Sequence, residues 1–176
     1  MEGKTCEETS LSVARFMEQS DANFAGNVHG GIIMKHIDSL AGMVAFRHSR
    51  SNVVTASVDR LDFHGPVFIG NLLRLKGCVN MVGRTSMEVG VRVEAEDLLT
   101  DEVRHIASAY LTLVALDENA RPKEVPPIVV DDEDKKRRNA EAIARRKTRL
   151  EEKQMEKARS QAPYYDSGVL HREEIP

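Results

Sequence analysis

The chain has 176 residues, of which 41% are hydrophobic and 30% charged, and its formal net charge is −3. This length fits one domain with an appendage, and a slightly acidic chain gives no indication of a nucleic-acid partner. No run approaches the roughly 18 apolar residues of a membrane-spanning helix, and residues 1–8 lack the apolar stretch of a signal peptide, so we expect no membrane partner.

The first predicted elements are a strand, a turn and a helix. Residues 9–18 mix β-branched, aromatic and polar side chains as strands do, and residues 20–23 have the composition of a turn. Residues 27–31 follow as a loop. From residue 31 to about residue 47, apolar side chains recur at steps of three and four, which predicts an amphipathic helix. Its apolar stripe consists of Ile33, Ile37, Leu40 and Val44.

After this helix, every strong pattern is typical of strands. Residues 52–63 are rich in Val and Thr, and residues 103–116 are largely apolar. Between them, residues 72–82 and 86–95 alternate apolar and polar side chains. Four or five long strands joined by short turns predict an antiparallel sheet. The helix is its large apolar partner, so the predicted fold class is α+β.

The composition changes after three prolines between residues 121 and 127. Residues 131–160 contain eleven Lys or Arg and eight Asp or Glu residues, with sparse apolar positions. This composition predicts a charged, mostly exposed helix. The predicted organisation is therefore one domain at 1–127, and a charged helical extension with an irregular tail at 128–176.

The two cysteines, Cys6 and Cys78, lie far apart in the sequence and lack the short spacing of metal ligands. We expect Cys6 to be a free thiol near the terminus and Cys78 to be a strand residue, consistent with a reducing cytoplasm. Glycine motifs that bind nucleotide phosphates are also missing from the sequence. The chain therefore predicts no metal and no separate cofactor.

The segment from residue 27 to residue 38 has the most chemical content. Gly30 and Gly31 have no Cβ, so a ligand can approach their backbone closely at the start of the helix. The N–H groups of a helix start suit an oxyanion. Asp38 lies about two turns further along, where a general base or a nucleophile can act. An ester or thioester hydrolase needs these parts.

Several separated blocks of the sequence resemble the hotdog-fold acyl-CoA thioesterases, nearest the brain-type cytosolic acyl-CoA hydrolases and their single-domain bacterial relatives. The resemblance covers residues 11–127 and is specific, because the blocks agree in order and spacing. It implies a long antiparallel sheet wrapped around the helix. It also implies dimers with a continuous sheet, commonly assembled as trimers of dimers into homohexamers. The blocks are residues 27–38, 41–42, 47–48, 54–59, 62–63 and 125–127.

The resemblance also implies roles for particular residues. Asp38 matches the general base or nucleophile, and Asn27 matches the residue that orients the water or the thioester. These two residues face each other across the dimer interface in the family, so a homodimer of this chain would form two equivalent sites. The implied reaction is the hydrolysis of acyl-CoA to a fatty acid and coenzyme A. Coenzyme A is then part of the substrate and not a cofactor.

Further residues are predicted to bind the substrate. Hydroxyl groups of the second strand alternate onto one face near Asp38, and basic side chains suit the phosphates of coenzyme A. The family places contacts to coenzyme A near the hairpin at residues 83–86. The predicted binding residues are His29, Thr55, Ser57, Arg60, Lys76, Arg84, Thr85 and Ser86.

Two other functions stay open from the sequence. One is a hotdog hydratase or dehydratase, which would use His29 with Asp38. The other is a non-catalytic acyl-CoA-binding or scaffold protein, with the helix at residues 131–160 as its interaction arm.

Overall fold

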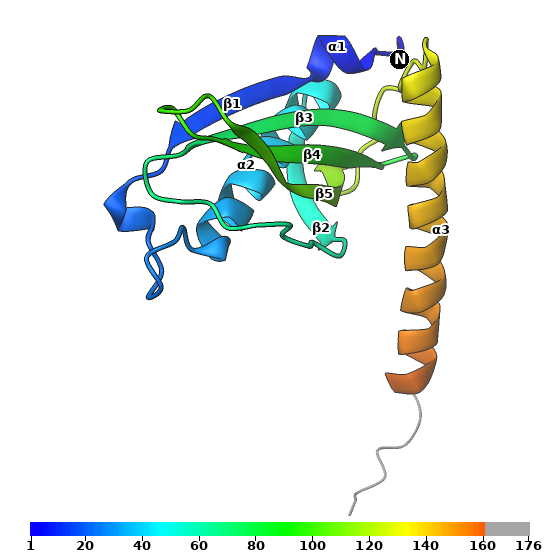
Figure 1. Cartoon of the computed structure of the whole chain (residues 1–176). Coiled ribbons are helices and arrows are strands. Elements are labelled where there is room, and N and C mark those ends of the chain that lie inside the picture. The colour runs from blue at the N-terminus through cyan, green and yellow to red at the C-terminus, as the bar shows by residue number, and fades with distance from the viewer. Residues whose placement is uncertain (161–176) are drawn as a thin grey trace, which may run out of the picture. The chain divides into compact units, whose positions relative to one another are not determined.

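A computed structural model describes residues 1–160 of the chain, and the predicted irregular tail at residues 161–176 lies outside this part (Figure 1). The five strands and the two long helices occur in the predicted order, and a short N-terminal helix that the sequence did not predict precedes them. The helices are α1 (Cys6–Thr9), α2 (Gly30–Ser49) and α3 (Glu133–Ser160), with a short 3₁₀ turn at Gln19–Asp21. The strands are β1 (Leu11–Phe16), β2 (Asn52–Val58), β3 (Leu72–Val82), β4 (Ser86–Glu96) and β5 (Val103–Leu116).

The five strands form one antiparallel sheet in the order β1-β3-β4-β5-β2. Helix α2 contacts every strand, and Figure 1 shows it along the inner face of the sheet. The helix is amphipathic, so its apolar stripe enters the core with the inward side chains of the strands. Gly77 of β3 permits a close approach, because a Cβ there would lie 3.0 Å from Val44 and 3.1 Å from Leu40. The predicted sheet around one central helix is confirmed.

Strand β2 ends at Val58, five residues earlier than the sequence suggested. It lies at one edge of the sheet and pairs only with β5. Beyond Val58 the chain keeps isolated hydrogen bonds to β5, from Asp59 N–H to Tyr110 O and from His64 N–H to Ile106 O. The polar residues there have no buried face to fill, so regular pairing stops before the break at residues 65–66.

The prediction that Cys6 is a free thiol is wrong, whereas Cys78 lies on a strand as expected. Cys6 of α1 and Cys78 of β3 form a disulfide across a sequence separation of 72 residues. The fold brings them together because α1 packs against β3, a contact that no local pattern reveals.

The chain divides into two compact units, Met1–Ala142 and the remainder from residue 143 onward. The first unit contains the sheet, α2 and the first ten residues of α3. The domain boundary at residue 127 stays a prediction. Within the described residues, the structure contains no helix with the length and apolar character to cross a membrane.

Candidate active site

The carboxylate of Asp38 and the hydroxyl of Thr55 meet at an open edge of the domain. Asp38 lies on α2, Thr55 lies on β2, and the Thr55 hydroxyl donates a hydrogen bond of 2.7 Å to Asp38 Oδ1. Thr55 pairs with the buried Leu113, so it points to the same inner face as the core. Both side chains are nevertheless exposed in the single chain. Within its own chain, the carboxylate of Asp38 is therefore open to solvent.

The start of α2 is capped by His29. The backbone N–H of Gly31 donates to His29 Nδ1 at 2.9 Å, so this N–H is already in use. Gly31 also leaves room for the folded-back ring, because a Cβ at this position would lie 3.0 Å from it. Among the described residues the N–H of Gly30 has no hydrogen-bond partner. Of the two predicted oxyanion donors, Gly30 is therefore the one that a ligand finds open.

The two parts of the predicted site are far apart within one chain. Gly30 and Asp38 are separated by eight residues of α2, which is about 12 Å along a helix axis. One thioester carbonyl cannot contact both groups at once. His29 lies still further from Asp38, so these two side chains do not form a pair within the chain either.

The loop before α2 is a tight turn organised by Asn23. The side-chain Oδ1 of Asn23 accepts hydrogen bonds from the N–H of Ala25 at 2.8 Å and of Asn27 at 3.2 Å. Its backbone N–H donates to Asn27 O at 2.7 Å, and Gly26 adopts a left-handed φ of 83°. Within the described part of the chain, the side-chain Nδ2 of Asn23 makes no hydrogen bond. The sequence analysis assigned Asn23 only to a turn, and so missed an open amide donor.

The predicted coenzyme A ligands are spread over the domain. Ser57 lies on β2 beyond Thr55 and is half-buried. Arg60 pairs with Asp62 at 2.9 Å, and Arg84 lies 4.0 Å from Glu124. Lys76 points to the outer face of the sheet, where its Nζ donates to Glu94 at 2.9 Å.

Ser86, at the end of the hairpin between β3 and β4, lies on the face of the sheet opposite to Thr55. Ser86 pairs with Val114, which pairs with Val54, the residue before Thr55. Two strand spacings, about 10 Å, therefore separate Ser86 from β2. Because neighbouring residues alternate faces, Ser86 points away from the side that carries Thr55. Thr85 precedes it and accepts from the N–H of Ala115 with its backbone oxygen. Among the predicted site residues in the described part of the chain, hydrogen bonds join Thr55 to Asp38 and Gly31 to His29, and these two pairs lie at different places on the domain.

The fold and this site define a hotdog domain with a carboxylate on its central helix. A model of the thioesterase superfamily matches residues 25–102. A relative named cytosolic acyl coenzyme A thioester hydrolase, from Mus musculus, is 36% identical over 146 residues, which are 82% of this chain and 38% of the relative. The chain therefore spans about two-fifths of the length of that relative.

Two solved structures are similar over nearly their whole length. An apo-hexameric acyl-CoA thioesterase is 38% identical with a TM-score of 0.83, covering 86% of this chain and 97% of that one. An acyl-CoA hydrolase from Staphylococcus aureus, in complex with butyryl coenzyme A, coenzyme A and coenzyme A disulfide, is 34% identical with a TM-score of 0.79, covering 90% and 99%. The chain belongs to the thioesterase superfamily, in its branch of acyl-CoA thioester hydrolases.

Proposed function

We propose that this protein hydrolyses acyl-CoA thioesters to a free acid and coenzyme A, with Asp38 as the reacting carboxylate. The observation that carries the proposal is the 2.7 Å hydrogen bond from Thr55 to Asp38 at an exposed inner edge of the domain. The relatives support it, since they are named as acyl-CoA hydrolases and one of them was solved in complex with coenzyme A. The name of the mouse relative also supports a cytoplasmic location.

The amide that works with Asp38 is Asn23, in place of Asn27, in this proposal. Structures of the Staphylococcus aureus hydrolase include variants with one asparagine, one aspartate and one threonine replaced by alanine. In that protein the asparagine precedes the aspartate by 15 positions, and the threonine follows it by 17. Asn23 and Thr55 stand at these two spacings from Asp38, whereas Asn27 precedes it by only 11 residues. The open Nδ2 of Asn23 can donate the hydrogen bond that orients the water or the thioester.

In the proposed reaction, Asp38 takes a proton from water while the water oxygen attacks the thioester carbon. The developing oxyanion accepts a hydrogen bond from the N–H of Gly30. Collapse of the tetrahedral intermediate breaks the carbon–sulfur bond, and the coenzyme A thiolate leaves and takes up a proton. A second route has Asp38 attack first to give an anhydride that water then hydrolyses. Both routes use the same residues.

The site requires two copies of the chain in this proposal. Gly30 is about 12 Å along the axis of α2 from Asp38, and Asp38 is exposed in the single chain. A second protomer that brings its Gly30 and Asn23 to the Asp38 of the first completes the site and covers the carboxylate. A homodimer follows from this arrangement, and the hexameric relative supports the further assembly of such dimers into a hexamer.

Thiol release from a panel of acyl-CoAs of increasing chain length tests the proposed activity. We expect Asp38→Asn to lower turnover by roughly 10²- to 10⁴-fold, the usual contribution of a general base. Folding should be unchanged, because the side chain is exposed. Wild-type protein that binds acyl-CoA without releasing thiol would instead indicate a binding or scaffold protein. Hydration of an unsaturated acyl-CoA without thiol release would indicate the hydratase.

Mixing two inactive variants tests the composite site. When Asn23→Asp and Asp38→Asn subunits are unfolded together and reassembled, half of the dimers carry one chain of each kind. Such a dimer has one intact site if the residues come from different chains. The mixture should then regain about a quarter of the wild-type activity. If each site lies within one chain, mixing restores nothing.

A further inference from the structure

The N-terminal segment, residues 1–10, is fastened to two other parts of the domain. The backbone of Lys4 pairs with the segment before α3, since its N–H donates to Pro127 O at 3.0 Å and its oxygen accepts from Val129 N–H at 2.8 Å. Its side chain reaches the last turn of α2, where Nζ donates to His48 O at 2.7 Å. The segment therefore lies between the end of the central helix and the approach to α3.

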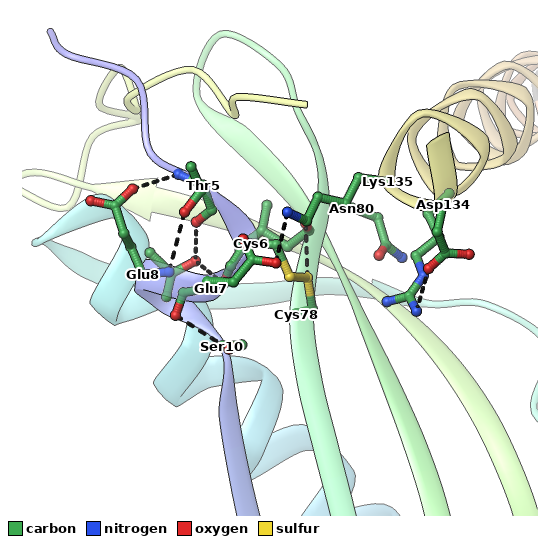
Figure 2. The surroundings of a disulfide bond; sticks show 12 residues. Thr5, Cys6, Glu7, Glu8, Ser10, Cys78, Asn80, Asp134 and Lys135 are labelled. Carbon is green, nitrogen blue, oxygen red and sulfur yellow. Dashed lines mark hydrogen bonds and ion pairs between the residues drawn. A yellow bond between two sulfur atoms is a disulfide. The ribbon is translucent and has the colours of Figure 1, made fainter. Parts of the chain in front are cut away.

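The disulfide fixes this segment to the sheet. Figure 2 shows Cys6 of α1 bonded to Cys78 on β3, beside Thr5, Glu7 and Lys135. Gly77 faces α2, so Cys78 faces outward, and Asn80 lies on the same outer side two residues further along. The backbone oxygen of Asn80 accepts a hydrogen bond of 2.8 Å from Asn139 of α3. One side of β3 thus carries both the disulfide and a contact to α3.

Lys135 links the disulfide to the start of α3. Its Nζ lies 2.7 Å from Glu7 Oε1, 2.5 Å from Asp131 Oδ1 and 3.1 Å from Asp132 Oδ2. Hydrogen bonds to Asp131 and Glu7 raise the pKa of Lys135 above its usual value, and Lys135 lowers the pKa of Glu7. Because Glu7 follows Cys6 directly, release of Cys6 would loosen a support of the first turn of α3.

The hollow beside the disulfide is too small to bind a metabolite, which favours redox chemistry of the two cysteines themselves. Cys6 and Cys78 are both half-buried. They line a small hollow with Lys135 and Arg138, and it has room for about one water molecule. Both cysteines are therefore partly open to solvent, while the hollow is too small to hold a metabolite.

We infer that Cys6 and Cys78 form a redox modification site for low-molecular-weight disulfides and thiols, and that its oxidised form holds the N-terminal segment and the first turns of α3 on β3. This inference uses the cytoplasmic location proposed above, where a protein disulfide is usually transient. It is independent of the hydrolytic chemistry at Asp38.

The exchange is balanced with glutathione disulfide as the oxidant. One cysteine thiolate attacks glutathione disulfide, forms a mixed disulfide and releases one glutathione. The second cysteine thiolate then attacks the protein sulfur of that mixed disulfide and releases the second glutathione. Two protein thiols lose two electrons and two protons in total, and the oxidant becomes two thiols. Excess glutathione reverses both steps.

The physical consequence concerns local opening. In the oxidised protein the N-terminal segment cannot separate from β3, because the bond closes a loop across 72 residues. In the reduced protein, the ion pair of Lys135 and the backbone and side-chain hydrogen bonds of Lys4 hold the segment without a covalent bond, and they open more often. Oxidation should therefore protect residues 4–10 and 133–142 and leave the Asp38 edge unchanged.

Hydrogen exchange on the full chain in glutathione buffers tests the inference. We expect amides in residues 4–10 and 133–142 to exchange about tenfold or more slowly in the oxidised protein. Alkylation of free thiols, followed by mass measurement, reports how much disulfide each buffer leaves. Cys6→Ser and Cys78→Ser should show the fast exchange in every buffer. Glu7→Gln is the matched control, since it weakens the ion pair of Lys135 but should still respond to oxidation.

Three results would overturn the inference. The first is that glutathione disulfide produces no bond between Cys6 and Cys78. The second is a persistent glutathione adduct on either cysteine without closure. The third is that the bond forms but exchange in residues 4–10 and 133–142 is the same in both states. Thiol release from acyl-CoA is measured alongside, and its loss would bear on the proposed hydrolase and not on this site.

Discussion

Two polar regions of the sheet domain use their charges in opposite ways. On the outer face, Glu94 accepts hydrogen bonds from Lys76 at 2.9 Å and from Arg92 at 2.7 Å, and Arg74 lies 2.7 Å from Glu96. At the inner edge, the exposed carboxylate of Asp38 accepts one side-chain hydrogen bond from the described residues, and it comes from the uncharged hydroxyl of Thr55. Carboxylates on the outer face are thus paired with basic side chains, whereas the carboxylate at the inner edge is paired only with a hydroxyl among the described residues.

This difference separates supporting residues from reacting ones. A carboxylate held by two cations has its charge balanced within the chain, and substitution there should change stability before it changes catalysis. A carboxylate with only a hydroxyl partner is free to accept a proton from water. Lys76 illustrates this difference. Its positive charge was predicted to bind a phosphate of coenzyme A, whereas in the structure it forms an ion pair with Glu94. We therefore expect the largest effects on rate at the inner edge that carries Asp38, and effects on stability at the outer face that carries Glu94.

The largest effect among these predictions concerns Asn23. Asn23→Asp keeps an oxygen that can accept from Ala25 and Asn27, so the turn should be preserved, but it removes the Nδ2 donor. We expect kcat to fall by about 10²- to 10³-fold, as for other single donors to a reacting oxygen. Steady-state thiol release gives the rate.

Asn27→Ala is the matched comparison, because the turn uses the backbone of Asn27, and its side chain makes no hydrogen bond to the described residues. A loss below about tenfold is expected for it. If Asn27→Ala costs more than Asn23→Asp, the original assignment of the working amide to Asn27 holds.

Much of the fold was predictable because one face of each strand is buried. The boundaries of β3 and β5 agree with the alternating and apolar patterns at residues 72–82 and 103–116. Helix α2 was found for the same reason, since its apolar stripe must face the sheet. The end of β2 was misjudged because an edge strand lacks a second neighbour, so its composition does not fix where pairing stops.

The candidate site was only partly predictable, because some of its residues follow from local sequence patterns and others depend on the folded geometry. Asp38 was proposed from its place after a glycine pair at a helix start and from the family resemblance, and Thr55 was proposed from alternation along a strand. Asn23 was not predicted, because asparagine is common in turns. The sequence therefore indicated a loop at residue 23 but did not indicate that its side-chain amide is open. The bond between Cys6 and Cys78 depends on packing of α1 against β3, which no local pattern encodes.

A smaller effect is expected when Thr55 loses its hydroxyl. Thr55→Val keeps the shape of the side chain but removes the donor to Asp38. We expect turnover to fall roughly tenfold, in line with a single hydrogen bond to a charged group. Stability should be unaffected, because Thr55 is exposed in the chain. Thr55→Ser restores the donor and should recover most of the rate. Equal losses in both variants would mean that the methyl group matters and the hydrogen bond does not.

The smallest effect is expected at the outer face of the sheet, where Glu94 lies. Hydrogen bonds from Lys76 and then Arg92 lower the pKa of Glu94 from its ordinary 4.5. A depressed folded pKa means that this stabilisation is complete above the unfolded value and is lost as pH falls through the folded value. Glu94→Gln should therefore cost about 1 kcal/mol near neutral pH. It should also lose less stability on acidification than the wild type.

Urea unfolding of both proteins between about pH 6 and pH 3 measures this difference. The two free energies of unfolding should converge as the pH falls, because protonation removes from the wild type the charge that the variant lacks at every pH. Thiol release at neutral pH should stay within about twofold of wild type, since Glu94 lies on the outer face, away from Asp38. Parallel stability curves, or a large loss of rate, would show that the two faces are coupled, and the distinction between supporting and reacting carboxylates would then fail for this domain.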